Sequence, residues 1–148
     1  YVYKRSGSTW AQEAYIKAVN NDAQDFFGSS VSIEGDTLAV GAEGEASNQT
    51  TITNGTGASS NNSNANTGAV YVYKRSGSTW TQEAYIKAVN NDALDYFGDM
   101  VSIDNGTLAV GVEREDSNQN TITNGTSASS NNSNAESGAV YVYSFYEK

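Results

Sequence analysis

The sequence predicts an all-β fold made of antiparallel sheets that pack face to face. The 148-residue chain is an internal repeat of 70 residues, because residues 1–70 and 71–140 differ at only 15 positions. Short apolar, β-branched runs alternate with tight turns within each repeat, as in β-hairpins. The runs at residues 38–41 and 69–73 are apolar on both faces, which is typical of sheets covered on both sides.

The first repeat begins with a strand at residues 1–5, which turns through Ser6-Gly7-Ser8 into a second strand at residues 9–17. A polar connector, residues 20–25, leads to a hairpin formed by residues 27–33 and 37–41. The next segment, up to residue 67, holds few side chains that can be buried, so we expect a long surface loop.

The turn of this hairpin is the strongest local signal. It reads Glu34-Gly35-Asp36 in one repeat and Asp104-Asn105-Gly106 in the other. Asn105-Gly106 is the clearer of the two, because both residues tolerate the positive φ that a tight hairpin turn requires.

Helix is the competing interpretation for residues 12–18 and 82–88, since Glu-Ala-Tyr-Ile-Lys-Ala has fair helix propensity. We favour strand, because the segment is short, begins with Thr-Trp and completes a set of four strands per repeat.

Four short antiparallel strands per repeat, each sheet covered by its neighbours, describe the blade of a β-propeller. The 148 residues then hold about two blade equivalents. Residues 1–17 supply the third and fourth strands of a first blade. Residues 18–88 form a complete blade with a long polar loop at 43–67, and residues 89–148 supply the first three strands of another with a loop at 113–137.

The motifs in this order resemble the FG-GAP repeat of integrin α-subunit propellers. The order is Phe-Gly, Val-Ser-Ile, Leu-Ala-Val-Gly, then Gly-Ala-Val-Tyr-Val-Tyr. The Asp-x-Phe-Gly connector and the Trp-x-Gln-x-x-Tyr-Ile-Lys strand are similar to the bacterial branch of that family. The resemblance covers nearly the whole chain, twice. It implies ligand binding on the face where the connections leaving the second and fourth strands emerge.

Three departures from the family pattern matter. The family is named in part for a Gly-Ala-Pro motif, and here Glu43 and Glu113 stand at the position of its proline. Integrin blades often carry a calcium loop between their first two strands, but here three residues fill that connection and cannot supply six to eight oxygen ligands. We therefore expect no integrin-type calcium site. Two repeats also fall short of the roughly four to eight blades of a closed propeller. Further repeats of a longer parent chain, or other copies of this chain, would have to complete it.

Composition excludes several function classes. The chain has no Cys and no His, which removes Ser-His and Cys-His nucleophilic machinery and the usual zinc sites. With 17 acidic and 8 basic residues the net charge is −9, so we expect neither nucleic acid nor membrane surfaces as partners. No apolar run reaches membrane-spanning length, so we expect no membrane insertion.

Acidic and amide side chains gather in the connectors and at the start of the long loops. This candidate ligand face comprises Asn21, Asp22, Asp25, Glu43, Glu45, Asn91, Asp92, Asp95, Glu113, Glu115 and Asp116. One interpretation is a surface that binds carbohydrate or protein, with a further Ca²⁺ site at Asp22, Asp25, Asp92 and Asp95. The alternative is that Asn and Asp occupy turns because they bond their own backbone there.

Other side chains carry weaker hypotheses. The carboxylates of Glu113 and Glu115 are of the type used in glycosidases, but nothing in the sequence fixes their separation, and we predict no enzyme. The strand aromatics are either sugar-stacking rings or, as we prefer, packing between blades. They are Tyr1, Tyr3, Trp10, Tyr15, Tyr71, Tyr73, Trp80 and Tyr85.

Glycosylation triplets, Asn-x-Ser/Thr, begin in the long loops at Asn48, Asn54, Asn61, Asn124 and Asn131. They matter only if the host glycosylates.

The sequence thus favours a non-enzymatic adhesion or recognition module at the cell surface or outside the cell, which binds carbohydrate or a cell-surface protein. The alternative is a self-assembling structural protein, a ring, fibre or matrix block whose blades are completed by neighbouring chains. Terminal sheets with uncovered faces and unpaired edges motivate it.

Overall fold

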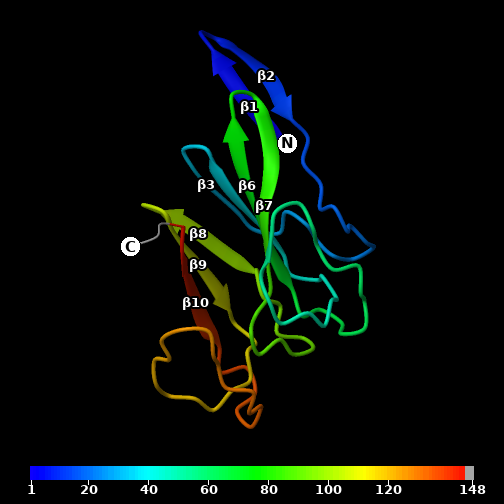
Figure 1. Ribbon diagram of the computed structural model, residues 1–148, viewed down its shortest axis with the longest axis vertical. Helices are drawn as coiled ribbons and strands as arrows, with labels where there is room; N and C mark the ends of the chain where they lie inside the picture. The colour runs from blue at the N-terminus through cyan, green and yellow to red at the C-terminus, as the bar shows by residue number, and fades with distance from the viewer. Residues whose placement is uncertain (146–148) are drawn as a thin grey trace.

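The computed structural model describes residues 1–145 as an all-β structure, which confirms the predicted fold class (Figure 1). Residues 146–148, the end of the third expected segment, lie outside the described residues. The ten strands are β1 (Val2–Ser6), β2 (Thr9–Ala14), β3 (Val31–Glu34), β4 (Thr37–Ala42), β5 (Thr53–Asn54), β6 (Ala69–Ser76), β7 (Thr79–Ile86), β8 (Met100–Asp104), β9 (Thr107–Val112) and β10 (Ala139–Ser144).

The strands form three antiparallel sheets. One is the β1–β2 hairpin, the central sheet has the order β3-β4-β6-β7-β5, and the third has the order β10-β9-β8. Its first four strands, β3, β4, β6 and β7, all lie within residues 18–88, the segment that the sequence assigns to one blade. β5 was not expected, because Thr53 and Asn54 lie within the long polar loop. In the structure they pair with Tyr85 and Ala84 of β7 and form the outer edge of the sheet.

No helix occurs among the described residues, so the helical alternative for residues 12–18 and 82–88 is wrong. β2 and β7 begin these segments as strands, each antiparallel to the strand before it. Alternating burial along β7 explains the choice, since Gln82 is buried between exposed Thr81 and Glu83. Pairing with β6 on one side and with β5 on the other outweighs the local helix propensity.

The hairpin turns are two residues long, within the two or three residues that the sequence predicts. β3 ends at Glu34 and β4 begins at Thr37, so two residues form the turn. In the equivalent turn Asn105 has φ 46° and Gly106 has φ 68°, the positive values that favour this dipeptide. A two-residue turn is still less able to surround Ca²⁺ than a three-residue one.

Both faces of the central sheet are covered. On one face Val70 and Val72 join Phe97, Leu108 and Val110 of the next sheet in one buried apolar cluster. On the other face Leu38 and Val40 lie in a second cluster with the tyrosines of β6 and β7.

The buried strand aromatics belong to this packing. Tyr71 and Tyr85 are fully buried, with ring centroids 5.1 Å apart, and Phe27 meets Tyr71 edge-on at 5.3 Å. These rings are therefore part of the core between sheets and are not available for sugar stacking. Tyr1, Trp10 and Tyr15, at the uncovered end, remain exposed.

Side chains of β3 and of Ser30, which precedes it, also join the central sheet to the β8–β9 hairpin. Ser30 Oγ accepts the Val101 N–H at 3.0 Å, and Ser32 Oγ accepts the Ile103 N–H at 2.9 Å. The Glu34 carboxylate accepts the N–H groups of the next turn, from Asn105 at 2.6 Å and Gly106 at 2.9 Å. The inner edge of β8 thus has hydrogen-bond partners although no strand pairs with it there.

The two ends of the stack are uncovered, as expected for an incomplete set of blades. Val140 and Val142 of β10 are 69% and 66% exposed, whereas Val70 and Val72, their equivalents 70 positions earlier, are fully buried. The same sheet face is therefore core in one repeat and surface in the other. The β1–β2 hairpin stands at the opposite end of the molecule (Figure 1).

Gly68 offers a test of this packing. Its φ is +79°, and a Cβ would overlap the backbone of Phe97, with which Gly68 forms a parallel bridge. Gly138, its equivalent, has φ +75°, but its Cβ would lie 3.4 Å from the nearest atom. We expect Gly68→Ala to lower the free energy of unfolding by roughly 3 kcal/mol or more, and Gly138→Ala by only roughly 1 kcal/mol. Urea denaturation measures both, and equal losses would contradict the packing described here.

Candidate recognition site

The connector after the fourth strand and the long loop after the second strand meet in each repeat. The Asn62 side chain donates to the Asp22 carboxylate, and Asn132 donates to Asp92 at 2.8 Å. Asn20 donates to the Ser59 carbonyl in the same way that Asn90 donates to Ser129. The structure therefore brings together the segments that the sequence assigned to one face.

Asn20 and Asn90 anchor these connectors to the sheets. Each amide oxygen accepts the hydroxyl of a strand tyrosine at 2.6 Å, Tyr71 for Asn20 and Tyr141 for Asn90. Burial raises the pKa of both tyrosines far above the ordinary value, so both hydroxyls stay protonated donors.

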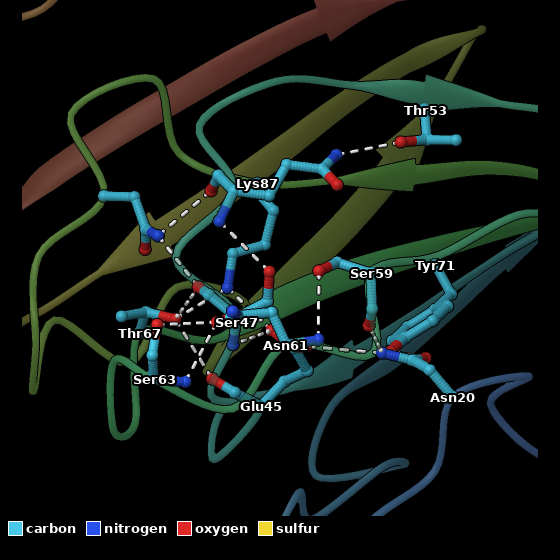
Figure 2. Close-up of polar contacts among 12 residues, drawn as sticks. Asn20, Glu45, Ser47, Thr53, Ser59, Asn61, Ser63, Thr67, Tyr71 and Lys87 are labelled. Atoms are coloured by element: carbon cyan, nitrogen blue, oxygen red, sulfur yellow. Dashed lines mark hydrogen bonds and ion pairs between the residues drawn. The ribbon is translucent and has the colours of Figure 1, made fainter.

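A fully buried ion pair holds the first long loop. Lys87, which follows β7, places its Nζ 2.7 Å from the Glu45 carboxylate and 2.6 Å from Thr67 Oγ1 (Figure 2). The Lys87 and Glu45 side chains are 0% and 1% exposed. Burial lowers the pKa of Lys87, and the nearby Glu45 carboxylate opposes that shift. The Glu45 carboxylate also accepts the Ser47 N–H, so it serves the interior rather than the ligand face.

Glu115 occupies the equivalent place in the second repeat. It is 3% exposed and accepts the Ser117 N–H at 3.1 Å and the Asn90 amide at 2.8 Å. No lysine or arginine of residues 1–145 forms an ion pair with it.

Asp25 and Asp95 are buried and act within turns. They are 5% and 3% exposed, and each accepts the N–H of the residue three positions earlier, Asp22 or Asp92. The turn alternative describes both residues. Burial, together with the charges of Asp92 and Glu115, raises the pKa of Asp95 to about 7.

The other residues of the candidate face lie nearer the surface. Asn21 and Asp22 are exposed, while Asn91 donates to the carbonyls of Ser47 and Gln49, both at 3.0 Å. Asn91 thereby ties the second connector to the first loop.

Glu43 and Glu113 lie where the two loops begin. A hydrogen bond with Asp99 raises the pKa of half-buried Glu43, and exposed Glu113 lies 3.6 Å from Arg114. Asp116 accepts the Glu136 N–H at 2.6 Å. Asp99 replaces Ser29, and Arg114 replaces Gly44, so this charged group belongs to the junction between the second and third sheets.

Within residues 1–145 no three acidic side chains gather as a metal ion would need. Asp22 with Asp25, and Asp92 with Asp95, each supply two carboxylates. Calcium at these residues stays a prediction. The predicted glycosylation residues Asn48, Asn54, Asn61, Asn124 and Asn131 are all exposed, and their modification also stays a prediction.

Sequence reasoning missed Lys87 and Thr67. The available signal was a lysine in Tyr-Ile-Lys-Ala, placed among residues expected to be buried. A lysine in such a position requires a carboxylate partner, but the sequence does not say which carboxylate lies near.

We expect Lys87→Met to lower the free energy of unfolding by roughly 3 to 5 kcal/mol, because it leaves the Glu45 charge buried without a partner. Lys17→Met is the matched control, since Lys17 is exposed, and its effect should stay within roughly 0.5 kcal/mol in dilute solution. Chemical denaturation measures both. A mild effect of Lys87→Met would mean that the ion pair does not hold the loop.

The raised pKa of Asp95 predicts a pH dependence of the free energy of unfolding. Its pKa is about 7 in the folded chain, against about 4 in an unfolded one, so the folded state retains a proton that the unfolded state releases. Stability should therefore fall as pH rises from about 4 to about 7. In Asp95→Asn, the decrease in the free energy of unfolding between about pH 4 and about pH 7 should be smaller than in the wild type by roughly 2 kcal/mol or more. Denaturation midpoints at several pH values test this, with Asp104→Asn at the exposed end of β8 as the control. Parallel pH profiles for wild type and Asp95→Asn would exclude this role.

No helix of the described residues is long and apolar enough to span a membrane.

Comparison with curated proteins and with solved structures found no match. The family model described as FG-GAP repeat matches twice, at residues 10–73 and 80–143. These ranges include both Phe-Gly hairpins, both long loops and the strands that follow them. The resemblance drawn from the motifs is thereby confirmed, and the chain belongs to the FG-GAP repeat family.

Proposed function

We propose that the chain is an extracellular, non-enzymatic recognition module that binds a carbohydrate or a protein through its loop face. The loop face comprises the connectors, residues 20–26 and 90–96, and the long loops, residues 43–67 and 113–137. One observation carries the proposal. The long loops have almost no regular secondary structure, yet the same side-chain hydrogen bonds hold them in both repeats.

The bonds recur at equivalent positions. Gln49 Nε2 donates to the Thr51 carbonyl and to Thr53 Oγ1, and Gln119 makes the same two bonds within its own loop. Ser59 Oγ accepts the Asn61 N–H at 3.2 Å, and Ser129 repeats the bond with Asn131. Loops fixed in advance lose less conformational entropy when a ligand binds, so the recurring bonds favour a binding role.

The chemistry of the face suits a neutral or cationic ligand. Asn61, Asn62, Asn131 and Asn132 present exposed side chains that hydrogen-bond hydroxyls or peptide groups. The net charge of −9 disfavours polyanions. These features support an uncharged glycan or a basic protein surface as the ligand.

The family supports a binding role. FG-GAP repeats form β-propeller-type modules that often act in adhesion and recognition, are generally non-enzymatic and are typically extracellular. The carboxylates singled out for acid-base work differ in setting, since Glu113 is exposed beside Arg114 and Glu115 is buried among hydrogen-bond donors. That arrangement disfavours a glycosidase pair.

A glycan array and a panel of cell-surface proteins test the proposal. We expect a ligand whose affinity falls at least tenfold, about 1.4 kcal/mol, in the double variant Asn62→Ala and Asn132→Ala. Asp104→Asn, at the exposed end of β8 and outside the loop face, is the control and should bind as the wild type does. Repeating the measurement with EDTA tests Ca²⁺ dependence. A folded chain that binds nothing on either panel would overturn the proposal.

A further inference from the structure

An open groove of about 940 Å³ runs beside β10. Residues 138–143 line one side, the second long loop lines the other, and buried Glu115 also contributes to the lining. In the described part of the chain β10 pairs only with β9, so its outer edge faces this groove. An apolar strand edge beside exposed Val140 and Val142 calls for a partner strand.

The equivalent groove of the first repeat is filled by β7. There β7 pairs with β6 along residues 70–76, and the first long loop closes over its other side. The Gly55 N–H donates to the Glu83 carbonyl at 2.6 Å, and Gln82 donates to the Gly57 carbonyl at 2.8 Å. Filling the groove buries Tyr85 completely and seats Lys87 on Glu45.

The sequence that fills this groove occurs a second time in the chain. Residues 9–18 differ from residues 79–88 only at Ala11, which replaces Thr81. They include β2, which lies at the opposite end of the molecule from β10 (Figure 1). Residues 9–18 of the same chain are therefore remote from the groove, but those of a second chain fit it.

The charges are complementary as well. Glu115 is buried and forms no ion pair with a lysine or arginine of residues 1–145, while Lys17, the equivalent of Lys87, is exposed. Residues 9–18 placed in the groove in the register of β7 would bring Lys17 to Glu115. The pair would then repeat the 2.7 Å contact between Lys87 and Glu45.

We propose that β2 of one chain enters the β10 groove of a second chain and completes its blade. β10 then replaces β1 as the partner of β2, because Tyr141-Val142-Tyr143 repeats Tyr1-Val2-Tyr3. β1 is the weaker competitor. Its one strand neighbour is β2, and Tyr1 and Tyr3 are 76% and 53% exposed.

The same register covers the apolar faces at both ends. Val140 and Val142 of one chain meet β3 of the other, whose Val31 and Ile33 are 62% and 56% exposed. Within the chain, the equivalent residues Val70, Val72, Val101 and Ile103 share one core cluster. Each chain offers one strand and one groove, so the contact is head to tail.

Mass photometry and sedimentation from about 1 μM to about 1 mM test the proposal. We expect concentration-dependent oligomers, at least tenfold weaker association for Lys17→Glu and for Glu115→Lys, and recovery when the two variants are mixed. Lys17 is exposed, so Lys17→Glu should fold even if Glu115→Lys does not. A wild-type chain that stays monomeric throughout, or a Lys17→Glu chain that associates normally, overturns the proposal.

Disulfide trapping tests the register. Ala84 pairs with Val72 inside the chain, so Ala14 of one chain should face Val142 of the other. The wild type has no cysteine, which removes any background. A mixture of Ala14→Cys and Val142→Cys chains should give a cross-linked heterodimer under a mild oxidant such as diamide. The control mixture of Ala84→Cys and Val142→Cys should give none, and equal cross-linking in both mixtures overturns the register.

A substitution at Gly7 distinguishes strand exchange from docking of an intact β1–β2 hairpin. Its φ of +59° makes Gly7→Val unfavourable in the hairpin turn. If β10 replaces β1, weakening the hairpin should tighten association. Gly77→Val alters the equivalent turn, at φ +63°, and should lower stability without tightening association. Unchanged or weaker association of Gly7→Val overturns the exchange.

Discussion

One constraint governs the structure: a sheet of this repeat buries its faces only against another sheet. Val70 and Val72 are core because the next sheet covers them, whereas Val140 and Val142 have the same sequence context and lie in solvent. The hydrophobic gain therefore arises between repeats more than within one, as in other quasi-one-dimensional repeat proteins. The hydrogen bonds that Ser30, Ser32 and Glu34 accept from backbone N–H groups of the next sheet and its turn then fix how neighbouring sheets align.

The loop face depends on the same stacking. Lys87 directly follows β7 and forms an ion pair with Glu45, which lies near the start of the loop that crosses over that strand. The loop is held by the blade it covers, and Asn91 of the next connector binds the same loop. Glu115, the counterpart of Glu45, forms no ion pair with a lysine or arginine of the described residues, so the second loop lacks the buried ion pair that holds the first.

The candidate face could be predicted by segment but not by side chain. The sequence places Asp22 and Asp25 together, yet Asp22 is exposed and Asp25 is buried in a turn. Glu43 and Glu45 are two positions apart, and only Glu45 enters the interior to meet Lys87. Burial at these positions depends on which loop lies above them, and polar segments carry no periodic pattern that reveals it.

The sequence by itself determined the repeat, the strands and the family, because period-two patterning, Phe-Gly hairpins and turn dipeptides are local signals. It also excluded histidine and cysteine chemistry through composition alone. Only the tertiary structure decided that β5 joins the sheet, that Lys87 and Glu45 form a buried pair, and that identical valines are core in one repeat and surface in the next. These outcomes depend on contacts between residues far apart in the chain. Two near-identical repeats have the same local sequence signals, so only the sheets that pack beside each repeat make its contacts different.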